Sequence, residues 1–159
     1  MSAINSRHFR EAVGKYATGV TVVTTLGATG KPVGMTVNSF ASVSLDPPLV
    51  LWSVDKYSRL FEAFSNAPRF AVHILRHDQQ YLAKGFSDDR DDVCAGMTFG
   101  EGENGLPILA DVSVSLQCDV VNRHDEGDHI ILIGRVIHIA STDVDPLLFF
   151  AGEYRRLQR

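Results

Sequence analysis

Short runs of apolar and β-branched residues, separated by glycine, proline and polar turns, recur along most of the chain. Runs of this composition are typical of β-strands. Strands are expected over 20–26, 49–54, 70–75, 112–121 and 129–140. A further strand is expected to begin near Val33. The 112–121 run alternates between apolar and polar residues, which predicts one buried face and one face in solvent. A polar turn over 122–127 joins it to the last strand in a long hairpin.

A few segments have apolar residues at helical spacing instead. Residues 5–16 carry an apolar stripe, which predicts a short amphipathic helix whose stripe packs on the body of the protein. A second helix is expected over 58–65, capped by its first residue, and a third over 78–84. Residues 85–105 show no apolar period, and the charged run at 88–92 within them is expected to form a solvated loop or a mobile lid.

The stretch 34–54, GMTVNSFASVSLDPPLVLWSV, combines two apolar runs with a cluster of small hydroxyl and amide side chains. Pro47 and Pro48 must interrupt a strand here, because proline cannot donate to a ladder. Many neutral donors and few charges suit a flat, heteroatom-rich ligand and its phosphate. The alternative is an ordinary edge hairpin whose serines face water.

Composition sets the wider limits. With 159 residues, 45% hydrophobic and 21% charged, the chain is expected to form a single domain over 1–159. Short turns join most consecutive strands, which predicts an antiparallel barrel. A net charge of −4 without a basic cluster argues against nucleic acid as a partner. No run approaches the roughly 18 apolar residues of a membrane span, and no signal peptide is visible, so no membrane contact and a cytoplasmic location are expected.

Several familiar reactive motifs are missing from the chain. It contains no G-x-G-x-x-G after a strand, no Walker-type lysine motif, no G-x-S-x-G and no H-E-x-x-H. Cys94 and Cys118 have neither C-x-x-C nor metal-ligand spacing, and the six histidines are scattered, so no metal site is expected. Two unpaired cysteines suit a reducing compartment.

Four segments carry a family resemblance. They are FREAVGKYATGVTVVTT (9–25), GMTVNSFASVSLDPPLV (34–50), GDHIILIGRV (127–136) and DPLLFFAGEYRRL (145–157). In order and spacing they resemble the flavin reductase family of FMN-binding split-barrel proteins. More narrowly, the chain is similar to the small NAD(P)H:flavin oxidoreductases that supply reduced flavin to separate monooxygenases. The resemblance implies a mainly β fold, an antiparallel Greek-key split β-barrel with a few short helices.

The resemblance also implies a set of flavin-binding residues. They are Thr36, Val37, Asn38, Ser39, Ser42, Ser53, Ser58, Arg59, Lys84, Gly85 and Phe86. The first four would lie against the isoalloxazine ring and ribityl chain, with backbone groups reaching the N5, O4 and N3 edge. The serines that follow, with Arg59, would hold the ribityl hydroxyls and phosphate, and 84–86 would add a further phosphate-side contact. Ser58 at a predicted helix N-terminus and the charged donor of Arg59 both favour an anion.

His129 and Tyr154 are the residues that the resemblance places on the NAD(P)H side. Without it, His129 is a half-exposed histidine at the start of a strand, and Tyr154 is a core or dimer-packing aromatic. Asp128 is expected to orient the turn and not to transfer protons. No catalytic side chain is expected, because hydride passes from nicotinamide C4 to flavin N5 and the two cofactors carry the reaction.

The implied function is NAD(P)H-dependent reduction of FMN or FAD. The chain would act as a homodimer and would supply a flavin-dependent monooxygenase with reduced flavin by diffusion. The alternatives are a pyridoxamine-phosphate-oxidase-like flavin oxidase, against which the Gly-Asp-His string argues, a non-catalytic flavin-binding carrier or redox sensor, and a flavin-free structural barrel. The residues leave open FMN against FAD, NADH against NADPH, tight against diffusing flavin, and the identity of the monooxygenase.

Overall fold

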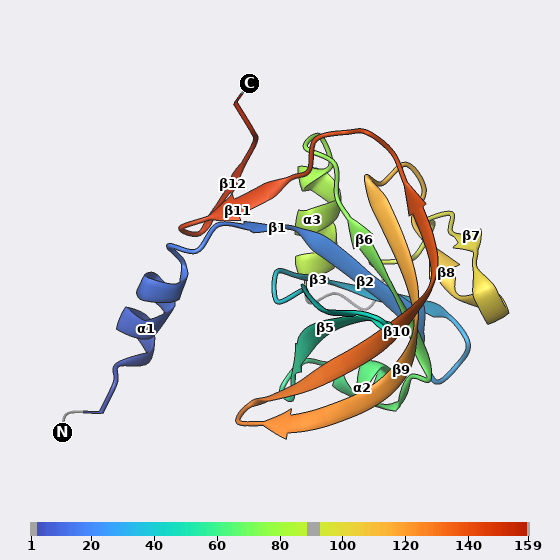
Figure 1. The fold of residues 1–159 in the computed structure, drawn as a ribbon, viewed down its shortest axis with the longest axis horizontal. Coiled ribbons are helices and arrows are strands. Elements are labelled where there is room, and N and C mark those ends of the chain that lie inside the picture. Colours follow the sequence, from blue (N-terminus) through green and yellow to red (C-terminus); the bar gives the residue numbers. More distant parts are fainter. Residues whose placement is uncertain (1–2, 89–92, 159) are drawn as a thin grey trace.

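The computed structural model describes residues 3–88 and 93–158, and strands dominate it (Figure 1). The helices are α1 (Ser6–Val13), α2 (Phe61–Asn66) and α3 (Gln80–Ser87), with a 3-10 turn at Glu103–Gly105. The strands are β1 (Thr18–Gly19), β2 (Thr21–Leu26), β3 (Pro32–Val37), β4 (Ala41–Leu45), β5 (Pro48–Asp55), β6 (Arg69–Ile74), β7 (Gly100–Glu101), β8 (Pro107–Ile108), β9 (Val114–Glu126), β10 (His129–Ser141), β11 (Leu148–Phe150) and β12 (Glu153–Arg155). No helix among the described residues is long and apolar enough to cross a membrane.

Seven of the strands form one antiparallel sheet in the order β3-β2-β6-β9-β10-β5-β4. Its two edge strands, β3 and β4, follow one another in the chain. Val37 of β3 and Trp52 of β5 belong to the same buried cluster, so the curled sheet encloses one core and is split between β3 and β4. The prediction of a mainly β, antiparallel split barrel with a few short helices is confirmed.

Aromatic side chains fill the interior of the barrel. Trp52 packs edge-on against Phe64 of α2 and Phe70 of β6, with ring centroids 5.0 and 5.8 Å apart. Gly134 of β10 makes room for Phe70, because a Cβ at this position would lie 2.5 Å from the end of the ring. Cys118 is buried beside them, as expected for a small hydrophobe.

A second buried cluster lies outside the barrel. It consists of residues from β2, α3 and the segments around 109–112 and 147. The polar face of the 112–121 run, which was expected to meet solvent, is covered as well, because Ser113, Ser115 and Gln117 are only 3%, 5% and 6% exposed. The predicted half-buried strand is therefore wrong over these residues. Their polar groups find partners in the covering segments, as where Glu103 N–H donates to Gln117 Oε1 at 2.7 Å.

The β9–β10 hairpin is longer than predicted. Strand β9 runs to Glu126, so most of the predicted polar turn at 122–127 is strand and the reversal takes only Gly127 and Asp128. Gly127 has a φ of 61°, a conformation that glycine adopts without steric cost. Polar residues can extend the ladder because this end of the hairpin is exposed.

Helix α1 forms where it was predicted but does not pack where it was predicted. Asn5 caps it, and its side-chain oxygen accepts from the N–H groups of Arg7 and His8. The apolar stripe stays open, with Phe9 59% and Tyr16 80% exposed, and none of the helix is buried. Figure 1 shows why: α1 projects away from the barrel, beyond the small β1-β11-β12 sheet.

Candidate functional site

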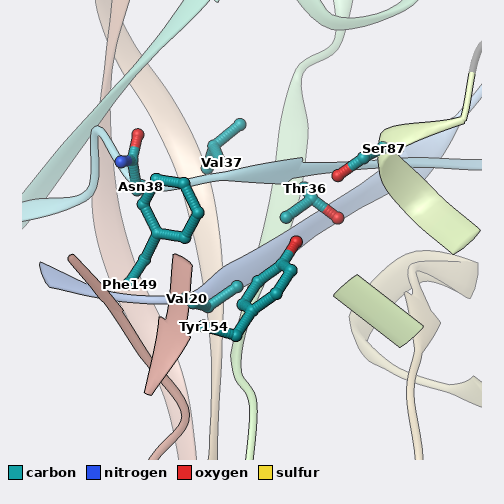
Figure 2. Close-up of a pocket in the computed structure, with 7 residues that line it drawn as sticks. All are labelled: Val20, Thr36, Val37, Asn38, Ser87, Phe149 and Tyr154. Carbon is teal, nitrogen blue, oxygen red and sulfur yellow. The ribbon is translucent and has the colours of Figure 1, made fainter. Parts of the chain in front are cut away.

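A first cavity of about 170 Å³ lies between the outer edge of β3 and the closing strands β11 and β12 (Figure 2). Its lining residues are Val20, Thr36, Val37, Asn38, Ser87, Phe149 and Tyr154. Phe149 and Tyr154 face each other across the β11–β12 ladder, with ring centroids 5.4 Å apart. The cavity therefore has an aromatic wall on one side and the hydroxyl and amide groups of β3 on the other.

A second cavity of about 260 Å³ continues from the first along β3. Its lining residues are Met35, Thr36, Ser58, Arg59, Leu60, Phe86, Ser87 and Asp88. Thr36 and Ser87 line both cavities, so the two form one cleft. Arg59 is the one cation among these described lining residues.

Helix α3 forms one wall of this cleft because two contacts hold it against β3. The Thr36 hydroxyl donates a hydrogen bond of 2.7 Å to the carbonyl oxygen of Ala83. Gly34 lies under the ring of Phe86, where a Cβ would come within 2.7 Å of Phe86 Cε1. Because β3 is an edge strand, half of its backbone N–H and C=O groups face away from β2 and are available to a ligand.

The structure brings seven of the sequence-predicted residues to the cleft. Thr36, Val37, Asn38 and Tyr154 line the first cavity, and Ser58, Arg59 and Phe86 line the second together with Thr36. These residues come from β3, the β5–α2 connection, α3 and β12. Segments far apart in the sequence therefore form one continuous site.

Ser58 reaches the site in a different way from the one predicted. Helix α2 begins only at Phe61, and its N-cap, Leu60, makes no side-chain capping bond. The Ser58 N–H donates to the Asp55 carbonyl at 3.0 Å, and its hydroxyl accepts from the Leu60 N–H at 3.2 Å. The predicted helix-capping role is therefore wrong: Ser58 belongs to a tight turn, whose local hydrogen bonds compete with helix extension.

Five other predicted residues line neither cavity. Ser39 and Ser53 bond to each other, since the Ser39 hydroxyl accepts from the Ser53 N–H at 3.0 Å and thereby fastens the β3–β4 connection to β5. Ser42 is exposed on β4, and Lys84 is exposed on α3 next to the half-buried Gly85.

His129 also lies apart from the cleft in this single chain. It begins β10 opposite Asp55, and its Nδ1 is 2.7 Å from the carboxylate of Asp128. This hydrogen bond, together with the charge of the imidazole, lowers the pKa of Asp128, as expected for a residue that orients the turn. The Asp128 carbonyl accepts from the Lys56 N–H at 2.9 Å, which ties this turn to the one that presents Ser58.

Several lining residues were not singled out from the sequence. Val20, Met35 and Leu60 have no polar group to mark them, and Ser87 follows directly after the predicted Phe86. Phe149 lies inside the closing segment, but only its register opposite Tyr154 shows that both rings face the cavity. Asp88, the first residue of the predicted 88–92 lid, lines the second cavity, and the other four lie outside the described residues.

The donor set of the cleft fits a flavin nucleotide. A tricyclic ring fits the aromatic wall and the edge of β3, and hydroxyls with one guanidinium suit a phosphorylated chain. Within 3–88 and 93–158, no cluster of three or more His, Cys, Asp or Glu side chains is placed to hold a metal ion.

Comparison with known proteins agrees with this fit. Residues 13–158 match the flavin reductase like domain. The chain is 45% identical to the FMN reductase (NADH) SmoA of Agrobacterium fabrum, over 98% of this chain and 88% of that protein. It is 41% identical to the reductase component of the flavin-dependent trigonelline monooxygenase of Acinetobacter baylyi, over 97% of this chain but only 50% of that longer protein.

A solved structure shows the same fold. The NADH:FAD oxidoreductase SgcE6 of Streptomyces globisporus, in complex with NAD and FAD fragments, superposes with a TM-score of 0.90 at 36% identity, covering 99% of this chain and 98% of that one. The domain match covers nearly the whole chain, and the relatives remain well above 30% identity over most of its length. The chain therefore belongs to the flavin reductase family that this domain defines.

Proposed function

We propose that this chain uses NADH to reduce FMN or FAD and releases the reduced flavin to a separate flavin-dependent monooxygenase. The observation that carries the proposal is the cleft along β3, which has an aromatic wall at one end and Arg59 at the other. Relatives named as an NADH-dependent FMN reductase and as a monooxygenase reductase component support the reaction and the partner. The unit proposed to act is one flavin reductase-like domain over 1–159.

The isoalloxazine ring is proposed to lie in the first cavity. Thr36, Val37 and Asn38 offer the free backbone edge of β3 to the polar side of the ring, while Val20 and Phe149 provide apolar contact. Ser39 and Ser53 support this edge from behind through their mutual hydrogen bond. A site held by a sheet edge keeps its geometry without the ligand, which lowers the entropic cost of binding.

The ribityl phosphate is proposed to lie in the second cavity. Ser58 and Arg59 come from the same tight turn, and a guanidinium binds phosphate through several charge-assisted hydrogen bonds. Helix α2 has only six residues and starts after this turn, so Arg59 supplies the favourable charge here. Ser42, Lys84 and Gly85 line neither cavity and are also proposed to contact the flavin.

The nicotinamide is proposed to approach from the side of Tyr154, which closes the first cavity. His129 is proposed to join this side from a second copy of the chain, because in its own chain it lines neither cavity. Bound flavin supplies the redox chemistry, since its N5 accepts the hydride from nicotinamide C4. The protein then has to orient the two cofactors and exclude competing contacts. Neither task needs a catalytic acid–base pair.

The chain is proposed to act as a homodimer in the cytoplasm. Phe9, Val13 and Tyr16 leave an apolar stripe of α1 open, and β4 is an exposed edge strand. A second copy that covers these surfaces would remove apolar area from water, worth about 25 cal/mol per Å². Cys94 and Cys118 are both free, which suits a reducing compartment.

The decisive experiment is anaerobic. Purified protein is mixed with NADH and an excess of FMN or FAD, and the flavin absorbance is followed against a control without protein. We expect bleaching over many turnovers, with one NADH consumed per flavin. If flavin binds but is not bleached, the chain is a flavin carrier or sensor and the reductase proposal fails.

A further inference from the structure

Lys56 connects two turns that serve different parts of the proposed site. The turn after β5 presents Ser58 and Arg59 to the second cavity, and the turn between β9 and β10 leads directly into His129. Asp55 and His129 form the end pair of the β5–β10 ladder, so both turns leave the sheet at the same point. Lys56 follows this pair and is therefore the first residue that can bond from one turn to the other.

Lys56 holds both carbonyl groups of the β9–β10 reversal, which consists of Gly127 and Asp128. Its main-chain N–H donates to the Asp128 carbonyl at 2.9 Å, and its ammonium donates to the Gly127 carbonyl at 2.8 Å. The ammonium also pairs with the carboxylate of Asp125. A charged donor makes a stronger hydrogen bond than a neutral one, and the Lys56 side chain is only 30% exposed, so water competes little with these bonds.

Each of the two turns is also braced by hydrogen bonds of its own. In the turn after β5, the Asp55 carbonyl accepts from the Ser58 N–H at 3.0 Å, and the Asp55 carboxylate accepts from the Tyr57 N–H at 2.8 Å. In the turn before β10, the Asp128 carboxylate lies 2.7 Å from Nδ1 of His129. A displacement therefore moves either turn as a unit, together with the side chain that it presents.

We propose that Lys56 is a positioning residue that couples binding of the flavin phosphate at one turn to binding of NADH at the other. This inference rests on the proposed function, because it takes the phosphate to lie at Ser58 and Arg59 and His129 to lie on the nicotinamide side. In the proposed homodimer His129 serves the site of the second copy, so Lys56 links the two active sites. Such coupling is reciprocal: a ligand that holds one turn in its binding position favours binding at the other by the same factor.

The test removes the ammonium group of Lys56 and keeps the rest of its stem. Lys56→Met loses the side-chain bonds to Gly127 and Asp125, whereas Lys56→Arg keeps a charged donor at the same position. Lys31→Met is the matched control, because it removes an exposed positive charge that lines neither cavity. The dissociation constants of oxidised FMN and riboflavin are measured from flavin fluorescence, and that of NAD⁺ is measured by calorimetry on the FMN-loaded chain.

Lys56→Met is expected to weaken FMN and NAD⁺ binding about fivefold each, and to weaken binding of riboflavin, which has no phosphate, less than about twofold. Lys56→Arg and Lys31→Met should stay within about twofold of the wild type for every ligand. Steady-state kinetics should show the KM for NADH raised about fivefold and kcat changed less than about twofold, because the reacting atoms belong to the cofactors.

Two double variants separate this coupling from a general loosening of the fold. In a His129→Ala background, Lys56→Met should no longer weaken NAD⁺ binding, because the residue through which it acts is gone. In an Arg59→Ala background, it should no longer weaken FMN binding. An effect of unchanged size in either background would overturn the proposal. So would a Lys56→Met variant that weakens riboflavin as much as FMN, or that changes the binding of no ligand.

Failure of this inference and failure of the proposed function give different results. A chain that binds FMN and NAD⁺ but does not oxidise NADH contradicts the proposed function, and the dissociation constants still decide the role of Lys56. A chain that reduces flavin, and whose Lys56→Met variant binds every ligand as the wild type does, overturns the inference alone. A wild-type chain that binds no FMN or no NAD⁺ overturns both.

Discussion

The Thr36 hydroxyl and the Ala83 carbonyl, 47 residues apart in the chain, are joined by a hydrogen bond of 2.7 Å. The bond links the edge strand of the barrel to α3, and both cavities of the proposed flavin site include Thr36. Ala83 is fully buried, so its carbonyl has no access to water. One side chain therefore both lines the cleft and fixes its wall.

Thr36→Val removes this hydrogen bond while keeping the shape of the side chain. The Ala83 carbonyl still accepts from the Ser87 hydroxyl at 2.7 Å, so it is not left without a partner. The loss of one hydrogen bond costs about 0.5–1.5 kcal/mol, which lowers Tm by about 1–6 °C in a domain of this size. Flavin binding should weaken as well, because the end of α3 is no longer held. Calorimetry and flavin titration measure the two effects. Thr36→Ser keeps the hydroxyl and should keep both properties; a Thr36→Ser variant as impaired as Thr36→Val would show that the methyl group, not the bond, matters.

Arg59→Ala tests the phosphate end of the site. The variant should bind FMN at least about tenfold more weakly, because a charge-assisted contact with phosphate is lost, and should bind riboflavin, which has no phosphate, as the wild type does. Lys31→Ala is the matched control, since Lys31 is an exposed cation that lines neither cavity. If Arg59→Ala weakens riboflavin and FMN alike, Arg59 does not bind the phosphate. An equal loss of FMN binding in Lys31→Ala would show that the effect comes from the net charge of the chain and not from Arg59.

Tyr154→Ala and His129→Ala test the nicotinamide side. Each should raise the KM for NADH by about fivefold or more, and by a larger factor than the KM for flavin, because the lost contact is made mainly to NADH. Steady-state kinetics with each substrate varied in turn separates the two constants. Equal effects on both substrates would remove the residue from the nicotinamide side. For His129, loss of the effect in a monomeric variant would show that it acts from the second copy.

Phe9→Asp should dissociate the homodimer. The stripe that includes Phe9 is the exposed face of α1, and a carboxylate there cannot be buried without a partner. Sedimentation should show a dimer for the wild type and a monomer for the variant at micromolar concentration. Arg7→Ala, on the polar side of the same helix, should remain dimeric. A wild-type chain that sediments as a monomer would contradict the proposed assembly.

His73 should make stability depend on pH. It is fully buried, with Nδ1 3.0 Å from the Val22 carbonyl and Nε2 accepting from the Leu109 N–H at 3.1 Å. Burial lowers its pKa to about 4 from the ordinary 6.5. The folded chain thus holds His73 neutral while the unfolded chain takes up a proton, so stability is complete above pH 6.5 and falls as the pH drops from 6.5 to about 4.

The size of this effect follows from the shift. The pKa difference of His73 between the folded and the unfolded chain corresponds to a loss of roughly 3 kcal/mol in the free energy of unfolding by pH 4. Urea unfolding between pH 7 and pH 4 measures it, and His73→Gln, which does not titrate, supplies the comparison. The variant should be less stable at pH 7 but lose less stability toward pH 4. Parallel pH profiles for the two proteins would show that His73 does not contribute.

The local pattern of apolar and polar residues was enough to predict most of the fold. Strands such as 20–26 and 70–75 were found because their β-branched composition reflects the preference of each residue for a pleated backbone. The helix that begins after Asn5 was predicted because apolar spacing and capping depend only on residues a few positions apart. Ser58 was misplaced by the same reasoning, since a serine before an apolar run can equally close a turn, and here that turn postpones the helix to Phe61.

By itself the sequence determined the strands, the order of the family segments and the polar residues of β3 and Arg59 that line the cleft. The tertiary structure alone decided which surfaces are covered. It buried Ser115 and Gln117, left Phe9 exposed, and brought Phe149 and Asn38 to the same cavity. The physical reason is range: backbone preference is set by neighbouring residues, whereas burial and the lining of a cavity depend on segments that arrive from far along the chain.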